Sequence, residues 1–234
     1  MARQPRCAAD GLLHLVELRW CADVAARMSD SELALQRHWL GEALSTCHVA
    51  LHAYALMPAR TLLLLTPESA DGLSRLAQAM GRRLAAEMRR RHGHRGPVMS
   101  GRFRSTILQP ESCLLDAMQF VELMPARDGA AEAAGIWSSA EVHRGGAQDA
   151  IVSDHSVYWS TGNTPFEREM LHRARLAEGL RDDLVRRFEG ALSGGWPVGD
   201  EGFLTALAQQ LQRRVVPRAP GRPPKRPADE SVPN

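Results

Sequence analysis

The sequence predicts an α+β fold, in which an antiparallel sheet with packed helices is followed by a helical C-terminal extension. Two observations support this prediction. Segments with the two-residue period of strands alternate with amphipathic helical segments, in the order β-α-β-β-α-β-α. Two of the strand segments are separated only by a short turn, which favours antiparallel pairing. Together these features suit a ferredoxin-like split β-α-β arrangement.

The central strand pair is expected in residues 51–67, LHAYALMPARTLLLLTP. Residues 51–56 show the two-residue period of a strand. Pro58 has no amide hydrogen to donate and fits a turn or a strand end. Thr61–Leu65 is a short apolar run bounded by Pro58 and Pro67, as in a buried central strand. We therefore expect a hairpin in the core of the sheet.

The remaining elements follow from periodicity and from helix-end signals. Pro125 is expected to end a helix, because proline disfavours helical geometry in the residue before it. A capping box with proline at the first helical position, Thr164-Pro165-Phe166-Glu167, opens a charged helix that should run to about Leu192. In chain order we expect a strand at 12–19, helices at 29–47 and 70–91, a strand at 103–108, and helices at 111–124, 164–192 and 203–214.

This pattern divides the chain into three parts. Residues 1–130 form the α+β domain, residues 131–214 a mostly helical extension, and residues 215–234 a basic, proline-rich tail that we expect to be disordered. With 234 residues, of which 44% are hydrophobic, the chain is long enough to bury a core. Its net charge is only +2, so the distribution of charge is more informative than the sum.

The composition also indicates the compartment. Cysteines at positions 7, 21, 47 and 113 lack the spacing of a metal site, and we expect reduced thiols of a cytoplasmic protein. No apolar run approaches the roughly 20 residues of a membrane span. Residues 1–20 are interrupted by charged side chains and are not typical of a signal peptide. We therefore expect no membrane partner.

Several motifs follow one another along most of the chain. They are Met57-Pro58, TPESADGLSRL (66–76), RRRHGHRGPVMSG (89–101), GRFRS (101–105) and LLDAMQFVELMPARDG (114–129), with weaker similarity through Trp137-Ser138-Ser139 to Gly221-Arg222-Pro223. In these motifs the chain resembles the REP-associated tyrosine transposases, a bacterial branch of the single-tyrosine HUH transposases with an IS200-like transposase domain. The resemblance implies the α+β fold and a family activity of cutting and joining single-stranded DNA.

The active site of that family uses two histidines and a tyrosine. The resemblance implies that the histidines, in an Asn-His-apolar-His run, bind Mg²⁺ or Mn²⁺, and that the tyrosine attacks phosphorus to form a covalent DNA link. The histidine positions fall on Arg60 and Leu62 here, and the tyrosine position falls on Phe120. Arginine stays protonated, leucine has no donor atom and phenylalanine has no hydroxyl. We therefore expect no catalytic residue, metal ligand or cofactor at these positions.

Phe120 retains the ring of the family's tyrosine. It lies about 100° around its helix from the apolar stripe that includes Leu114 and Val121, at the edge of that stripe. Two interpretations remain open. The ring packs at the periphery of the core, or it stacks on a nucleic-acid base, which requires a ring face but no hydroxyl.

A catalytic site rebuilt from other residues is a further hypothesis. His14 and His52 lie on expected strands, and Tyr54 and Tyr158 are the only tyrosines. A lone histidine on a strand is more often packed or hydrogen-bonded than bound to a metal. We therefore do not favour a rewired metal-dependent nuclease.

A dense basic segment lies between residues 82 and 104. It holds eight arginines against one acid, Glu87. The alternatives are a solvated helix face and a phosphate-binding surface, and the one-sided density favours the second. The tail at 217–226, PRAPGRPPKR, is either solvated or able to lie in an AT-rich minor groove. The expected DNA-binding residues are Arg82, Arg83, Arg89, Arg90, Arg91, Arg95, Arg102, Arg104, Arg222 and Lys225.

These observations predict a transposase-like protein that binds DNA, single-stranded or hairpin, without strand-cutting chemistry. Two alternatives remain open. One is an active enzyme that uses rewired residues or a partner subunit, and the other is a relic that keeps the fold without binding DNA. Family transposases can act as dimers, so a homodimer is compatible with the resemblance.

Overall fold

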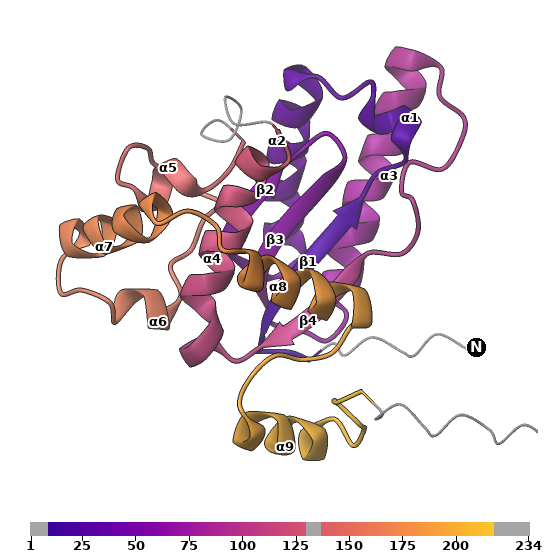
Figure 1. Cartoon of the computed structure of the whole chain (residues 1–234). Helices are drawn as coiled ribbons and strands as arrows, with labels where there is room; N and C mark the ends of the chain where they lie inside the picture. The colour runs from indigo at the N-terminus through magenta and orange to yellow at the C-terminus, as the bar shows by residue number, and fades with distance from the viewer. Residues whose placement is uncertain (1–8, 130–136, 218–234) are drawn as a thin grey trace, which may run out of the picture.

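The computed structural model describes residues 9–129 and 137–217. Its centre is an antiparallel sheet of four strands in the order β2-β3-β1-β4 (Figure 1). This sheet, with its packed helices, confirms the predicted α+β fold. The strands are β1 (Leu13–Arg19), β2 (Val49–Leu56), β3 (Arg60–Pro67) and β4 (Arg104–Leu108).

Helices cover both faces of the sheet, and the C-terminal ones return to it (Figure 1). None of the helices in the described ranges is long and apolar enough to cross a membrane. They are α1 (Ala22–Ala25), α2 (Asp30–Cys47), α3 (Gly72–His92), α4 (Pro110–Arg127), α5 (Ala140–His143), α6 (Ser156–Trp159), α7 (Pro165–Ala177), α8 (Asp182–Gly194) and α9 (Glu201–Gln210).

The hairpin of β2 and β3 confirms the expected strand pair. The Met57 amide donates to the Arg60 carbonyl at 2.9 Å and closes the turn, which contains Pro58. β3 also pairs with β1, where Leu62 lies opposite Glu17. β3 is therefore an inner strand with both faces buried, which explains its continuous apolar run.

Alternate side chains of β3 enter two separate apolar cores. Leu63 and Leu65 belong to the core beneath α2 and α3, whereas Leu62 and Leu64 belong to the core beneath α4 and α8. Successive side chains of a strand point to opposite faces, so one run of leucines supplies both cores. The second core contains the positions that the family resemblance marks as catalytic.

The sequence predicts that the helix at 111–124 ends before Pro125. In the structure α4 instead continues through Pro125 to Arg127. Proline removes one hydrogen bond from a helix. Here the Asp128 amide donates to the Met124 carbonyl at 2.9 Å and completes the last turn. Met124 and Pro125 are both buried, so tertiary packing holds the backbone in helical geometry.

The single charged helix expected from Thr164 to Leu192 is instead two helices, α7 and α8. Its predicted capping box at Thr164 is present. Gly179 has a φ of +76°, a left-handed conformation that favours glycine and ends the helical path. Gln119 of α4 donates to the Arg175 and Gly179 carbonyls at 2.6 and 2.9 Å. This break allows α8 to return onto the sheet.

Candidate functional site

Phe120 and Leu62, two of the three positions that the resemblance marks as catalytic, are both enclosed in the second core. Each has 0% exposure to solvent. The Phe120 ring packs on Phe188 of α8, with ring centroids 5.3 Å apart. Of the two interpretations of Phe120, the structure has the packed one, and the ring is fully buried because α8 covers that side of α4. No base can stack on this ring in the described arrangement.

Arg60 occupies the third position and is held by three carboxylates. Its guanidinium donates to both oxygens of Asp128, at 2.8 to 3.1 Å, and to Glu17 and Glu189 at 3.2 and 3.1 Å. Burial alone would lower the pKa of Arg60, but Asp128, Glu189 and Glu17 raise it overall. Arg60 is therefore a fixed cation inside an ion-pair network.

α8 closes the face on which the family active site would lie. Its neighbouring residues Phe188 and Glu189 contact Phe120 and Arg60, respectively. α8 also packs against β1 and β4. α8 thus covers the positions that the resemblance marks as catalytic.

Half of the eight arginines at 82–104 form ion pairs. Most of their acidic partners belong to α2 and β1, which are distant in sequence, so a count within the segment finds only Glu87. The surface is therefore less one-sided than its composition indicates. The two tail residues, Arg222 and Lys225, lie outside the described residues. The pairs are Arg83 with Glu42, Arg90 with Glu87, Arg91 with Glu32 and Glu87, and Arg104 with Glu17.

The other four arginines of this segment are exposed, and they form no ion pair within residues 9–129 and 137–217. Arg82 and Arg89 lie on α3, and Arg95 and Arg102 lie between α3 and β4. Arg102 lines a hollow of about 370 Å³ at the junction of α3 and this loop. These four guanidinium groups are the ones available to an anionic partner.

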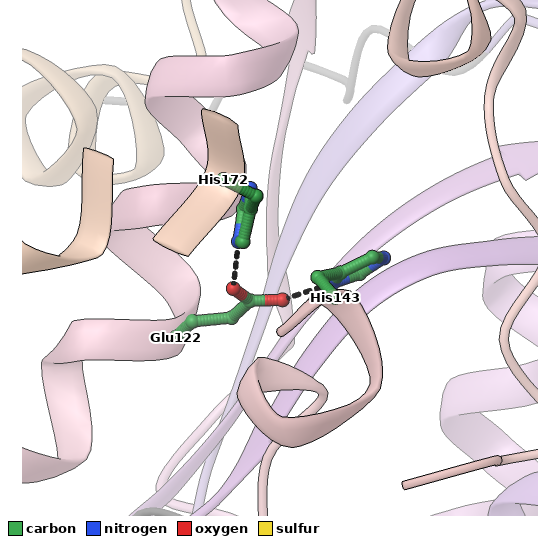
Figure 2. Close-up of side chains that lie close together, drawn as sticks. All are labelled: Glu122, His143 and His172. Carbon is green, nitrogen blue, oxygen red and sulfur yellow. Dashed lines mark hydrogen bonds and ion pairs between the residues drawn. The ribbon is translucent and has the colours of Figure 1, made fainter. Parts of the chain in front are cut away.

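A buried polar cluster lies beside α4 (Figure 2). Glu122 accepts hydrogen bonds from His143 Nδ1 at 2.5 Å and from His172 Nε2 at 2.6 Å, one at each carboxylate oxygen. The three side chains are at most 1% exposed. Ser139 also donates to Glu122, at 2.6 Å. The cluster ties α4 to α5 and α7, from which the two histidines project.

Pairing within this cluster stabilises the charges of Glu122 and His143. Burial alone would raise the pKa of Glu122, but His143 and His172 lower it well below its usual range. Burial alone would lower the pKa of His143, but Glu122 raises it overall. The carboxylate is therefore ionised and paired, in a place where an isolated charge would be strongly destabilising.

Sequence reasoning did not find this cluster. Glu122 lies in the motif that contains Phe120, but His143 and His172 follow it by 21 and 50 residues. No spacing rule connects positions this far apart on three helices. The one sequence signal for this cluster is Glu122 itself, which lies two residues from the apolar position Phe120. If the helix is enclosed on all sides, a buried carboxylate there requires a polar partner.

The residues considered for a rewired site are each packed in the fold. Burial lowers the pKa of His14 and of His52 to about 4. Tyr54 belongs to the core beneath α2 and α3. Tyr158 packs beside His143, with ring centroids 5.2 Å apart. The interpretation of the strand histidines as packed residues agrees with these positions.

A comparison with solved structures identifies the class of fold. The chain is similar to a REP-associated tyrosine transposase whose structure was solved bound to a REP hairpin, with 14% sequence identity and a TM-score of 0.51. The match covers 67% of this chain and 96% of that transposase. The chain therefore has the fold of a REP-associated tyrosine transposase, as its motifs predict.

A second similar structure is a candidate transposase from Deinococcus radiodurans R1, with 14% identity over 55% of this chain and 98% of that one. Its TM-score of 0.37 is too low to support an argument. No protein-family model and no curated protein matches the sequence.

Proposed function

We propose that this chain is a DNA-binding protein with a transposase fold that has lost strand-cutting chemistry. The observation that carries the proposal is the filled catalytic position: Arg60 is ion-paired, and Leu62 and Phe120 are buried beneath α8. Metal binding there would need two ligands, and phosphoryl transfer would need a hydroxyl. We propose the bacterial cytoplasm as its compartment, where DNA is accessible.

The proposed partner is single-stranded or hairpin DNA. The structurally similar transposase was solved with a REP hairpin. Arg82, Arg89, Arg95 and Arg102 supply exposed guanidinium groups on one helix and the loop that follows it. Arginine binds phosphate through two parallel hydrogen bonds, so these residues can hold a DNA backbone without reading its sequence. Arg222 and Lys225 remain proposed contacts of the tail.

The test is binding of the full chain to hairpin, single-stranded and duplex DNA at several salt concentrations. Replacing Arg82, Arg89 and Arg102 with alanine should weaken binding and flatten the salt dependence by about 0.7 log units per lost contact for single strands. The matched control replaces Arg173, Arg181 and Arg186, which are exposed on the C-terminal helical region, and changes the net charge equally. An equal loss in both variants would place the DNA site elsewhere.

Two other outcomes decide between the remaining hypotheses. A covalent protein–DNA adduct formed with Mn²⁺ would show that strand cutting survives through other residues or a partner subunit. Binding that is absent for all three DNAs at low salt would indicate a relic of the fold. Sedimentation of the free and DNA-bound chain would test the proposed homodimer.

A further inference from the structure

We propose that Glu122, His143 and His172 form a binding site for one divalent transition-metal ion of the zinc type. The three residues belong to α4, α5 and α7 and converge on one point inside the protein (Figure 2). One ligand atom from each residue lies within 4.8 Å of the other two. Among residues 9–129 and 137–217, no other group of three or more His, Cys, Asp or Glu side chains meets this condition.

The ligand set determines the class of ion. Two imidazole nitrogens and one carboxylate oxygen suit Zn²⁺, Co²⁺ or Ni²⁺, whereas Mg²⁺ prefers oxygen ligands and water. Zinc binds nitrogen and oxygen at about 2.0–2.2 Å, which separates tetrahedral ligand atoms by about 3.3 Å. The Glu122 oxygens now lie 2.5 and 2.6 Å from the two ring nitrogens. The oxygen and nitrogen atoms would therefore have to separate by roughly 0.7–0.8 Å to admit an ion.

The outward ring nitrogens determine where the imidazole protons would lie. His143 Nε2 and His172 Nδ1 are buried and have no hydrogen-bond partner among the described residues. With protons on the inner nitrogens, both outer nitrogens are therefore unsatisfied. An ion bound at the inner nitrogens would displace the protons held there, and each neutral imidazole would keep its one proton on the outer nitrogen.

The surroundings of the proposed site include a group that orients Glu122 and a cavity that reaches His143. Ser139 donates to Glu122 at 2.6 Å, as groups behind a metal ligand commonly do. A cavity of about 600 Å³ reaches His143 and is lined by Tyr158, Asp154 and Arg168. An ion can approach through this cavity, and a fourth ligand can come from water.

The proposed site is separate from the family's metal site. Phe120 and Glu122 lie two residues apart on α4, about 200° around the helix, so they face different neighbours. Phe120 contacts α8, whereas Glu122 contacts α5 and α7. An ion here would join the C-terminal helices to the sheet domain, so it should stabilise the folded chain.

The experiment uses the full chain without an affinity tag, treated with a chelator and then dialysed. Calorimetry with ZnCl₂ should give one ion per chain, and Co²⁺ should give the visible absorption of four-coordinate cobalt. The melting temperature should rise with Zn²⁺ and stay unchanged with Mg²⁺. Glu122→Gln, His143→Gln and His172→Gln should each weaken zinc binding by at least about tenfold.

The controls are His38→Gln and His48→Gln, two exposed histidines whose loss should leave zinc binding unchanged. The absence of one-to-one binding by the folded wild-type chain would overturn the proposal. So would zinc affinity that is unaffected by both His143→Gln and His172→Gln. If a variant does not fold, the wild-type cobalt spectrum decides, because six-coordinate cobalt bound weakly at the surface gives only faint bands.

Discussion

The histidines show how single residues depend on their surroundings. His14 and His52 are buried without a carboxylate partner, and burial lowers the pKa of each to about 4. His143 is also buried, but Glu122 raises its pKa. The same side chain is therefore neutral in one place and stabilised as a cation in another, which sequence position alone does not reveal.

The buried strand histidines make stability depend on pH. The pKa of His14 is about 4 in the folded chain against 6.5 for an exposed histidine, so as the pH falls the unfolded chain binds the proton first. The free energy of unfolding should therefore fall between pH 6.5 and 4, by up to about 3 kcal/mol for this residue. Urea unfolding across this range should show a flatter profile for His14→Gln.

The control for this measurement is His38→Gln, an exposed histidine that should leave the profile unchanged. His143 acts with the opposite sign, because its raised pKa contributes stability that is lost as the pH rises. Only the difference between variant and parent therefore isolates His14. Parallel profiles for His14→Gln and the parent would contradict the prediction.

Phe120 offers a second prediction at this scale. Phe120→Tyr adds a hydroxyl to a ring that is fully buried against Phe188. A buried hydroxyl without a partner should lower the free energy of unfolding by about 1–3 kcal/mol. The matched control is Phe166→Tyr, because Phe166 is 65% exposed and should tolerate the hydroxyl. Equal stability of the two variants would show that a hydroxyl at position 120 finds a partner or solvent.

At the scale of elements, α8 determines which side chains of β3 and α4 are accessible to a ligand. Phe188 fills the space beside Phe120, and Glu189 pairs with Arg60. The three positions that the resemblance marks as catalytic thus carry other side chains, and α8 packs over them. Restoring the side chains alone would leave the cover in place.

We therefore predict that Arg60→His, Leu62→His and Phe120→Tyr together restore no chemistry. Leu62 has no exposure, so the new imidazole would be buried in an apolar core, which costs about 1–3 kcal/mol. The assay is covalent adduct formation with a labelled hairpin oligonucleotide in Mn²⁺, with DNA binding measured on the same sample. An adduct in the folded triple variant would show that α8 does not block the site.

At the scale of the whole molecule, sequence-distant helices share one core with the sheet. Leu184, Val185, Phe188 and Leu192 of α8 lie in the same apolar cluster as Leu62. Burial of one such side chain contributes roughly 1.5–3 kcal/mol, and the net stability of a domain is only about 5–15 kcal/mol. The C-terminal helices are therefore needed for the stability of the sheet domain.

This shared core predicts the behaviour of fragments. The boundary expected near residue 130 falls within 130–136, outside the described residues. A fragment of residues 1–136 should lack a cooperative urea transition, because removing α8 exposes the apolar face of α4. Adding residues 137–234 in trans should restore the transition. Cooperative unfolding of the first fragment by itself would contradict the prediction.

The sequence by itself determined the strands of the sheet and the longer helices packed on it. The hairpin at 51–67 and the capping box at Thr164 are local patterns, and the structure has both. Motif order indicated the transposase fold and placed Arg60, Leu62 and Phe120 at the catalytic positions. These conclusions were accessible because neighbouring residues in the chain carry the relevant periodicity and spacing.

The tertiary structure alone decided which side chains meet. It placed α8 over Phe120, gave three of the eight arginines of the basic segment acidic partners from α2 and β1, and brought His143 and His172 to Glu122. Such contacts join residues that are tens of positions apart, so no local pattern encodes them. Burial then determines the charge state of each group, because the environment in which a side chain loses water exists only after the helices have packed.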